Sequence, residues 1–328
     1  MMQAANDKDT APVLHPVSRD GLYGAIDAAG KLVIKPRFQS LSKFAEGRAA
    51  FAQNGMDGLI DERGDVICPP RYAQIRGFSE GYAQVEMEDR YGFVDRSGEL
   101  VVPCVFHEAS AFSHGLAAVR ESALSKMGFI DHNGAFCIRP QFALADNFAE
   151  GLASVLYEDR TGQWGKHGYI RTDGAQAIPD RFVIAYNFSE GVAAVAEEED
   201  ERGAILGFID SIGGYIIPPK FSGADVRFSE GLAAVWQENS GFGYIDRHGQ
   251  IVIRHAFYFA DHFAHGLAEV GIKRKDGTWY GFINREGEFV IEPQFAYASS
   301  FEGGLAAVST GQESGYINLK GEFVWMDS

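Results

Sequence analysis

The stretch GFVDRSGELVVPCVF, residues 92–106, and the shorter FSHGLAAV, residues 112–119, decide the fold of this chain. Residues that favour strands stand on both sides of the DRSG tetrad, and a third such run, LAAV, ends the second segment. An Asp followed three residues later by Gly favours a type I turn, because the Asp side chain accepts turn N–H groups and Gly adopts a left-handed backbone cheaply. The two segments therefore predict a small antiparallel meander of three strands.

The same pattern recurs through all 328 residues. The glycine that opens the stretch has counterparts spaced 34 to 40 residues apart, and another Gly stands six residues after each of them. The opening glycines are Gly24, Gly58, Gly92, Gly128, Gly168, Gly207, Gly243, Gly281 and Gly315. A regular period of this length indicates a tandem array, so we expect about nine three-stranded β units.

A polar pair within the FSEG segment invites a catalytic interpretation. It reads Ser189-Glu190 in one unit, but the Ser position elsewhere holds Ala, and the Glu position holds His or Gly. The Phe, the Gly and the Ala two residues after that Gly are kept in all eight copies. A catalytic nucleophile or acid could not vary in this way, so we interpret the segment as a packing joint between units in which the polar pair is dispensable.

The candidate functional residues lie where the units differ. From the opening Gly to the FSEG Gly the distance is 23 or 24 residues, whereas from there to the next opening Gly it varies between 11 and 17, as surface loops do. We expect these variable loops to emerge along one edge of the assembly and to bind a partner. The candidate partner-binding residues are Glu197, Glu198, Glu199, Asp200, Glu201, Trp164 and Trp279.

Composition excludes several classes of partner. The formal net charge of −16 argues against nucleic acid and anionic membranes, which require clustered Lys and Arg, and leaves a basic protein partner open. No apolar run reaches the roughly 18 residues of a membrane span, and the N-terminus has neither the basic nor the apolar region of a signal peptide. We expect a cytoplasmic protein with a flexible tail at 1–11 and a single repeat domain at 12–328.

Catalytic and metal motifs are missing from the sequence. It contains no GxSxG, P-loop, HExxH or Rossmann fingerprint. Four histidines gather at His248, His255, His262 and His265, but their spacing matches no zinc-ligand motif, and one Asp per unit is too sparse for calcium. We therefore expect a protein that is not an enzyme and needs no cofactor.

The repeated GFVDRSGELVVP and FSHGLAAV segments resemble the bacterial WG-repeat (KWG-type) family from about residue 20 to residue 328. The Trp that names the family, just before the opening Gly, is replaced in every unit, by Tyr23, Asp57, Tyr91, Met127, His167, Leu206, Phe242, Tyr280 and Ser314. The resemblance implies repeated β units and an interaction role, and it supplies no catalytic residues.

Two architectures and two functions follow. Nine whole units without a split terminal unit favour an open, curved superhelical array, and a closed β-propeller is the alternative. The favoured function is a protein-binding scaffold with an acidic surface, of which an inhibitor or immunity protein for a toxin is one form. The alternative is a glycan or cell-wall binding module that uses the loop aromatics. The sequence does not indicate an oligomeric state.

Overall fold

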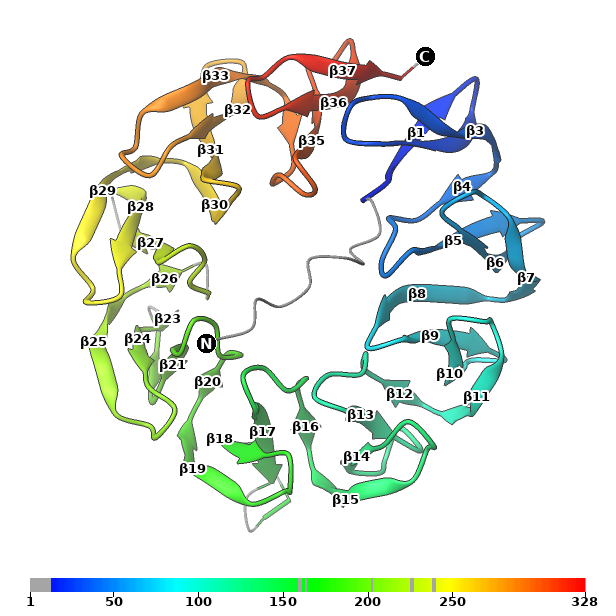
Figure 1. Ribbon diagram of the computed structural model, residues 1–328. Helices are drawn as coiled ribbons and strands as arrows, with labels where there is room; N and C mark the ends of the chain where they lie inside the picture. Colours follow the sequence, from blue (N-terminus) through cyan, green and yellow to red (C-terminus); the bar gives the residue numbers. More distant parts are fainter. Residues whose placement is uncertain are drawn as a thin grey trace, which may run out of the picture.

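The computed structural model describes residues 13–158, 161–162, 164–201, 203–224, 227–237 and 240–327. Within them, nine antiparallel sheets are arranged around one axis as a nine-bladed β-propeller (Figure 1). The expectations of an all-β fold and about nine units are confirmed, and the expectation of an open array is wrong. The predicted tail at 1–11 lies outside the described residues. In the described part of the chain there is no helix of the length and apolar character needed to span a membrane.

Each blade except the first has four strands, which run from the axis outward in the order inner, second, third and outer. The inner strands are β4 (Ser40–Leu41), β8 (Gln74–Ser79), β12 (Glu108–Ala109), β16 (Leu144–Ala145), β20 (Ile184–Ala185), β26 (Gly223–Ala224), β30 (Phe259–Ala264) and β34 (Tyr297–Ala298). The second strands are β1 (His15–Arg19), β5 (Arg48–Gln53), β9 (Tyr82–Met87), β13 (Ala117–Arg120), β17 (Leu152–Glu158), β21 (Ala193–Ala196), β27 (Leu232–Gln237), β31 (Leu267–Arg274) and β35 (Leu305–Ser309).

The third and outer strands complete the blades. The third strands are β2 (Leu22–Ile26), β6 (Met56–Asp61), β10 (Arg90–Asp95), β14 (Met127–Ile130), β18 (Trp164–Arg171), β24 (Leu206–Ile209), β28 (Gly241–Asp246), β32 (Gly277–Ile283) and β36 (Ser314–Asn318). The outer strands are β3 (Leu32–Phe38), β7 (Val66–Tyr72), β11 (Leu100–Phe106), β15 (Phe136–Phe142), β19 (Gln176–Phe182), β25 (Tyr215–Phe221), β29 (Ile251–Phe257), β33 (Phe289–Phe295) and β37 (Phe323–Met326). A separate hairpin, β22 (Glu199–Asp200) with β23 (Gly203–Ala204), is inserted in blade 6.

The expectation of three strands per unit holds only for blade 1, which consists of β1 to β3. In the other blades the connector before the FSEG segment forms the inner strand. Six of these eight inner strands are only two residues long, too short to give a periodic pattern in the sequence. The third and outer strands are joined by the predicted turns. In blade 4, for example, the Asp131 side chain accepts the N–H groups of Asn133 and Ala135, and the bond from Ala135 holds the pKa of Asp131 below its usual range.

The hydrophobic core lies between the blades. One strand face packs against the preceding blade and the other against the following blade. Between blades 4 and 5, for instance, Phe129 and Phe142 of blade 4 pack with Phe148 and Val155 of blade 5, and all four side chains are buried. Similar apolar clusters fill the successive interfaces, so each blade is stabilised mainly by its neighbours.

The FSEG segment forms the hairpin between the inner and second strands. In blade 6, Ser189 and Val192 exchange two main-chain hydrogen bonds, and Glu190 and Gly191 between them have φ angles of 51° and 84°. Two left-handed residues in a two-residue loop make a type I′ turn, whose twist matches that of the strands it joins. The equivalent Glu, His or Gly is left-handed in all eight hairpins, and so is the Gly that follows it.

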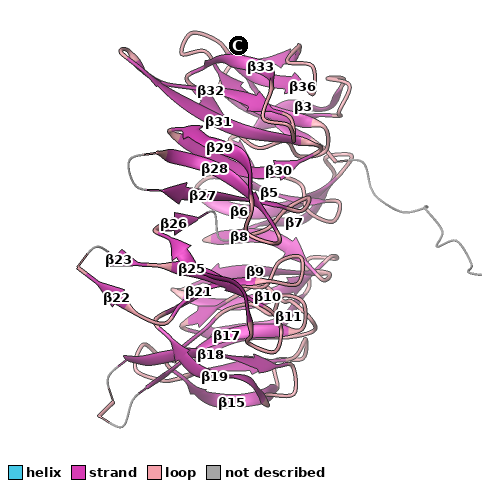
Figure 2. Cartoon of the chain, turned by 90° about the vertical axis from the view of Figure 1, so that its left-hand side faces the viewer, coloured by secondary structure: helices cyan, strands magenta, loops and turns pink. Residues whose placement is uncertain are grey.

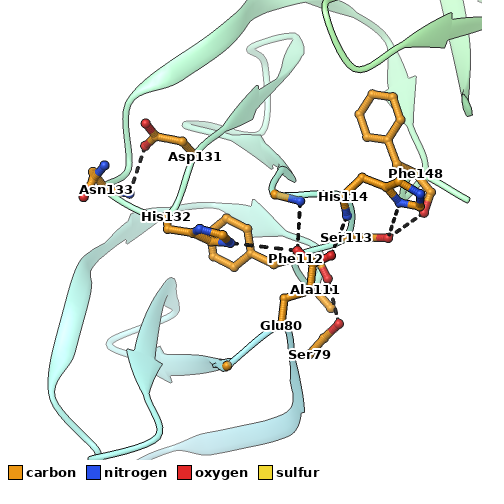
Figure 3. Close-up of polar contacts among 12 residues, drawn as sticks. Ser79, Glu80, Ala111, Phe112, Ser113, His114, Asp131, His132, Asn133 and Phe148 are labelled. Carbon is orange, nitrogen blue, oxygen red and sulfur yellow. Dashed lines mark hydrogen bonds and ion pairs between the residues drawn. The ribbon is translucent and has the colours of Figure 1, made fainter. Parts of the chain in front are cut away.

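The polar pair of this hairpin joins successive blades from blade 2 to blade 8, so the interpretation of these side chains as dispensable is wrong. Glu80 of blade 3 accepts hydrogen bonds from the N–H groups of His114 and Gly115 in blade 4, at 2.7 and 2.9 Å (Figure 3). His114 in turn accepts from Gly151 of blade 5, at 3.1 Å. Ser113 donates to the Phe148 carbonyl at 2.6 Å. His replaces Glu because the joint requires a hydrogen-bond acceptor, which a neutral imidazole also supplies.

These links form a directional series from blade 2 to blade 8. The pairs of acceptor residue and amide are Glu46 with Gly81, Glu80 with Gly115, His114 with Gly151, Glu150 with Gly191, Glu190 with Gly231, and Glu230 with Gly266. Arg247 of blade 7 also binds Glu190, at 2.9 Å. Partial burial raises the pKa of Glu190, but the bonds from Arg247 and Gly231 outweigh this effect and leave that pKa below its usual range.

Blades 1 and 9 meet and close the ring (Figure 1). The Ser18 N–H of β1 donates to the Asp327 carboxylate at 3.0 Å, and the Arg19 guanidinium lies 4.8 Å from the centre of the Trp325 ring. Gly30 approaches the outer strand of blade 9 so closely that a Cβ there would lie 2.3 Å from the Val324 carbonyl oxygen. The ring closes without a split blade, through main-chain and side-chain contacts between blades 1 and 9.

Candidate binding face

The alternation of strand direction places the variable loops on one side of the ring. Each inner strand enters the FSEG hairpin and each third strand enters an Asp turn, so these two turns share a face, the turn face. The loops between second and third strands lie on the opposite face, the loop face. Figure 2 shows the β22–β23 and β31–β32 hairpins projecting from the same side of the molecule.

The acidic run stands on the loop face of blade 6, at the base and in the first strand of the β22–β23 hairpin. Glu197 has protein partners: its carboxylate lies 3.3 Å from Arg181 Nε and accepts a hydrogen bond from the Tyr215 hydroxyl at 3.2 Å. Glu198, Glu199 and Glu201 are exposed, and the side chain of Asp200 lies outside the described residues. Burial and the Glu197 charge raise the pKa of Tyr215 to about 12.

The two loop tryptophans differ in their availability. Trp164 begins β18 in blade 5, and 75% of its surface is exposed. Trp279 lies in β32 of blade 8, where its indole N–H donates to Asp276 and the Arg274 guanidinium lies 5.7 Å from the ring centre. Trp164 is therefore free to contact a partner, whereas Trp279 is engaged within its own hairpin.

Basic side chains connect the loops of neighbouring blades. Lys126 of blade 4 lies 2.9 Å from the Glu158 carboxylate of blade 5. Lys166 of blade 5 donates to the main-chain carbonyl of Glu197 in blade 6, at 2.7 Å. The loops of blades 4, 5 and 6 therefore form one continuous surface.

Two apolar loop residues that the sequence analysis missed lie on this surface. Leu124 of blade 4 is 98% exposed, and Ile205 of blade 6 is 42% exposed. A groove of about 350 Å³ separates the acidic hairpin from β25, lined by Glu198, Glu199, Ile205, Tyr215 and Pro219 among others. Apolar residues within the variable loops could have identified both positions from the sequence, because surface loops are otherwise mostly polar.

The four histidines are not brought together. His248 is exposed in a turn, and His255 lies 2.9 Å from the Gly241 carbonyl on the outer strand of blade 7. His262 pairs with Asp261 at 2.7 Å, and His265 is a left-handed hairpin residue. No group of three or more potential metal ligands occurs among the residues that the structure describes.

A pair of acidic side chains lies at the interface of blades 8 and 9, away from the loop face. A bulge in β30 sets Asp261 and His262 opposite Glu269 of β31. Burial and the neighbouring Asp261 charge raise the pKa of Glu269 to about 8. Burial also raises the pKa of Asp261, but hydrogen bonds from His262 and Ser300 more than offset this and lower it to about 2.

Solved structures of low sequence identity share the fold. A crystal structure of the eukaryotic initiation factor is 11% identical, with a TM-score of 0.67 over 96% of each chain. The computationally designed Ika8 protein is also 11% identical, with a TM-score of 0.50 over 91% of this chain and 96% of its own. At such identities the likeness concerns the fold alone.

The repeats themselves give the family. The comparison with curated proteins found no match. The family model described as WG containing repeat matches eight segments, residues 23–56, 58–91, 91–122, 127–160, 168–199, 207–239, 242–279 and 280–312. The chain therefore belongs to the WG-repeat family.

Proposed function

We propose that this protein is a non-enzymatic scaffold that binds another protein through the loop face of blades 4 to 6. The observation that carries the proposal is the exposure of Leu124, Trp164 and Ile205 on three consecutive blades. Large apolar side chains gathered on one exposed face favour a protein interface, and Trp is enriched among the residues that dominate binding energy.

The charge of this face indicates the kind of partner. Glu198 and Glu199 border the groove beside Ile205. A partner that presents a Lys or Arg would place its aliphatic stem against the apolar floor and its charge at the carboxylates. A cytoplasmic inhibitor or immunity protein that neutralises a basic toxin is one form of this function.

A glycan-binding function is less well supported. Platforms for sugars use exposed aromatic rings, and Trp279 is held by Arg274 and Asp276. Of the two predicted loop tryptophans, this leaves only Trp164 as an exposed ring.

The test compares two exposed apolar residues on opposite faces. Ile212 is 83% exposed in an Asp turn on the turn face and supplies the matched control. We expect the protein purified from its native host to retain a partner in stoichiometric amount, Trp164→Ser to lose it, and Ile212→Ser to keep it. Equal retention by Trp164→Ser, or a monomer without a partner, would contradict the proposal, and binding to a glycan array in place of a protein would support the alternative.

A further inference from the structure

The interface between blades 9 and 1, which we call the seam, is built differently from the others. Six interfaces pair an aromatic ring of one third strand with the hairpin Phe of the next blade, at 4.5 to 5.2 Å between ring centres. Within residues 13–38, the part of blade 1 that the structure describes, there is no inner strand and no such Phe. Instead His15 lies 5.3 Å from Tyr316 of blade 9. His15 occupies a repeat position at which every other blade has Ala, namely Ala49, Ala83, Ala117, Ala153, Ala193, Ala233, Ala268 and Ala306.

The seam has a smaller buried apolar cluster than the other interfaces. Its apolar cluster holds three buried residues, Val17, Ile26 and Leu305, whereas the other clusters hold seven to ten. Gly303 stands where the other hairpins have Glu or His, so the side chain that would link blade 9 to blade 1 does not exist. A cavity of about 100 Å³ adjoins His15.

His15 itself is an unsatisfied polar group in this thin interface. Only 5% of its surface is exposed, and its Nε2 atom has no hydrogen-bond partner among the described residues. A buried polar group without a partner destabilises the folded state, and a buried charge does so more strongly. The imidazole is therefore tolerated in the seam while it is neutral.

The surrounding charges do not compensate a protonated His15. Glu302 from the hairpin of blade 9 would favour the charged form, but it is paired with Lys43 of blade 2, which disfavours it. Tyr316 and Tyr297 of blade 9 also face this region, and Asp327 is bound to the Ser18 N–H. Burial is the largest influence and lowers the pKa of His15; Glu302 opposes this shift and Lys43 adds to it.

The edge of β1 that faces the axis carries no described strand, and it has few free N–H groups to offer one. Pro16 has no N–H to donate, and the next donor on that edge, the Ser18 N–H, is already bound to Asp327. Both features are ones that natural proteins use to protect exposed strand edges. The seam therefore depends on its own side chains.

We propose that the seam is an acid-sensitive clasp, at which protonation of His15 separates blade 1 from blade 9 while the other interfaces stay closed. The sign follows from linkage: the closed form binds the proton more weakly than the open form, so closure is lost as pH falls below the ordinary His value of 6.5. The population of the open form should rise about fivefold over the first pH unit below that value and about tenfold per unit after that, until the closed form also binds the proton.

Hydrogen exchange of the full chain, corrected for the intrinsic pH dependence of the rates, tests the proposal. Between pH 6.5 and 5.5 we expect protection in β1 and β37 to fall about fivefold, with protection unchanged in β21 and β24 of blade 6, whose hairpin joints use Glu150 and Glu190. His15→Phe keeps a ring but cannot be protonated, so its seam should be insensitive to this change of pH. His248→Phe alters an exposed histidine away from the seam and should behave as the wild type.

Two results would overturn the proposal. One is an acid-induced loss of seam protection that persists in His15→Phe, and the other is a wild-type seam whose protection does not change with pH. If the Phe ring prevents folding, His15→Leu serves the same purpose, because it also removes the titrating group.

Discussion

Replacing the buried Glu269 by Gln should stabilise the protein, and increasingly so as pH rises. In the folded state the pKa of Glu269 is raised from 4.5 to about 8 by burial and by Asp261. Between these values the unfolded chain loses the proton and the folded chain keeps it, so the wild type loses stability by ~1.4 kcal/mol per pH unit. At pH 7 the accumulated loss is about 3 kcal/mol.

Gln avoids this loss because it is uncharged and close in shape to the protonated acid. Blade 3 has a natural precedent, since Gln84 occupies the same repeat position and donates to the Ala109 carbonyl of blade 4 at 2.9 Å. In Glu269→Gln the equivalent acceptor is the carbonyl of Ala298 in β34. The variant should therefore gain a link between blades 8 and 9.

Urea denaturation at pH 4.5, 5.5 and 7, followed by tryptophan fluorescence, measures this effect. The difference in free energy of unfolding between Glu269→Gln and the wild type should grow by about 3 kcal/mol from pH 4.5 to 7. The exposed Glu286→Gln controls for the loss of one carboxylate at the surface. A difference that stays constant with pH, or a wild type more stable than the variant at pH 7, would refute the reasoning.

Three further substitutions test the joints between blades. Glu190→Ala removes the acceptor for the Gly231 N–H and should destabilise the protein by about 1 kcal/mol, since solvent screens this half-exposed network; an unchanged urea midpoint would contradict it. Gly249→Ala puts a Cβ 2.8 Å from the Ile217 side chain at a φ of 74° and should cost about 2 kcal/mol, visible as a lower melting temperature. Tyr244→Phe removes the hydroxyl bond to a main-chain carbonyl of β30 and should cost about 1 kcal/mol, and an equally stable variant would show that the carbonyl finds another donor.

Fold class and unit number could be predicted because they depend on features that every unit repeats. The Asp turns could be predicted because each one depends only on the residues of a short segment: an acceptor side chain followed three residues later by Gly. Asn284 and Asn318 supply the same acceptor in the last two units. Ring closure could not be predicted in this way. It depends on contacts such as Ser18 with Asp327, which occur once and join residues at opposite ends of the chain.

The role of the polar hairpin pair was missed for a different reason. Variation between Glu80 and His114 indicates a tolerant position only if charge is the property that matters. The joint needs an acceptor on a left-handed residue, and both side chains satisfy it. A test based on hydrogen-bonding capacity would have grouped the two residues together.

The candidate binding face was partly predictable. Variable spacing identified the loops, and the alternation of strand direction put them on one face. The sequence could not indicate that Trp279 is engaged by Arg274 while Trp164 is exposed, because this difference depends on side-chain packing within each hairpin. Nor could it show that Lys126 and Lys166 connect three neighbouring loops.

The directional hairpin links affect how the number of blades in such a propeller can change during evolution. A gene segment that encodes one blade brings both halves of the joint, the acceptor side chain that faces the following blade and the Gly amide that receives the bond from the preceding one. Among blades 2 to 8, a duplicated blade therefore brings a hairpin joint that matches both of its neighbours. Only the pair of blades that holds the chain ends, with His15 and Tyr316, must be kept as a matched set.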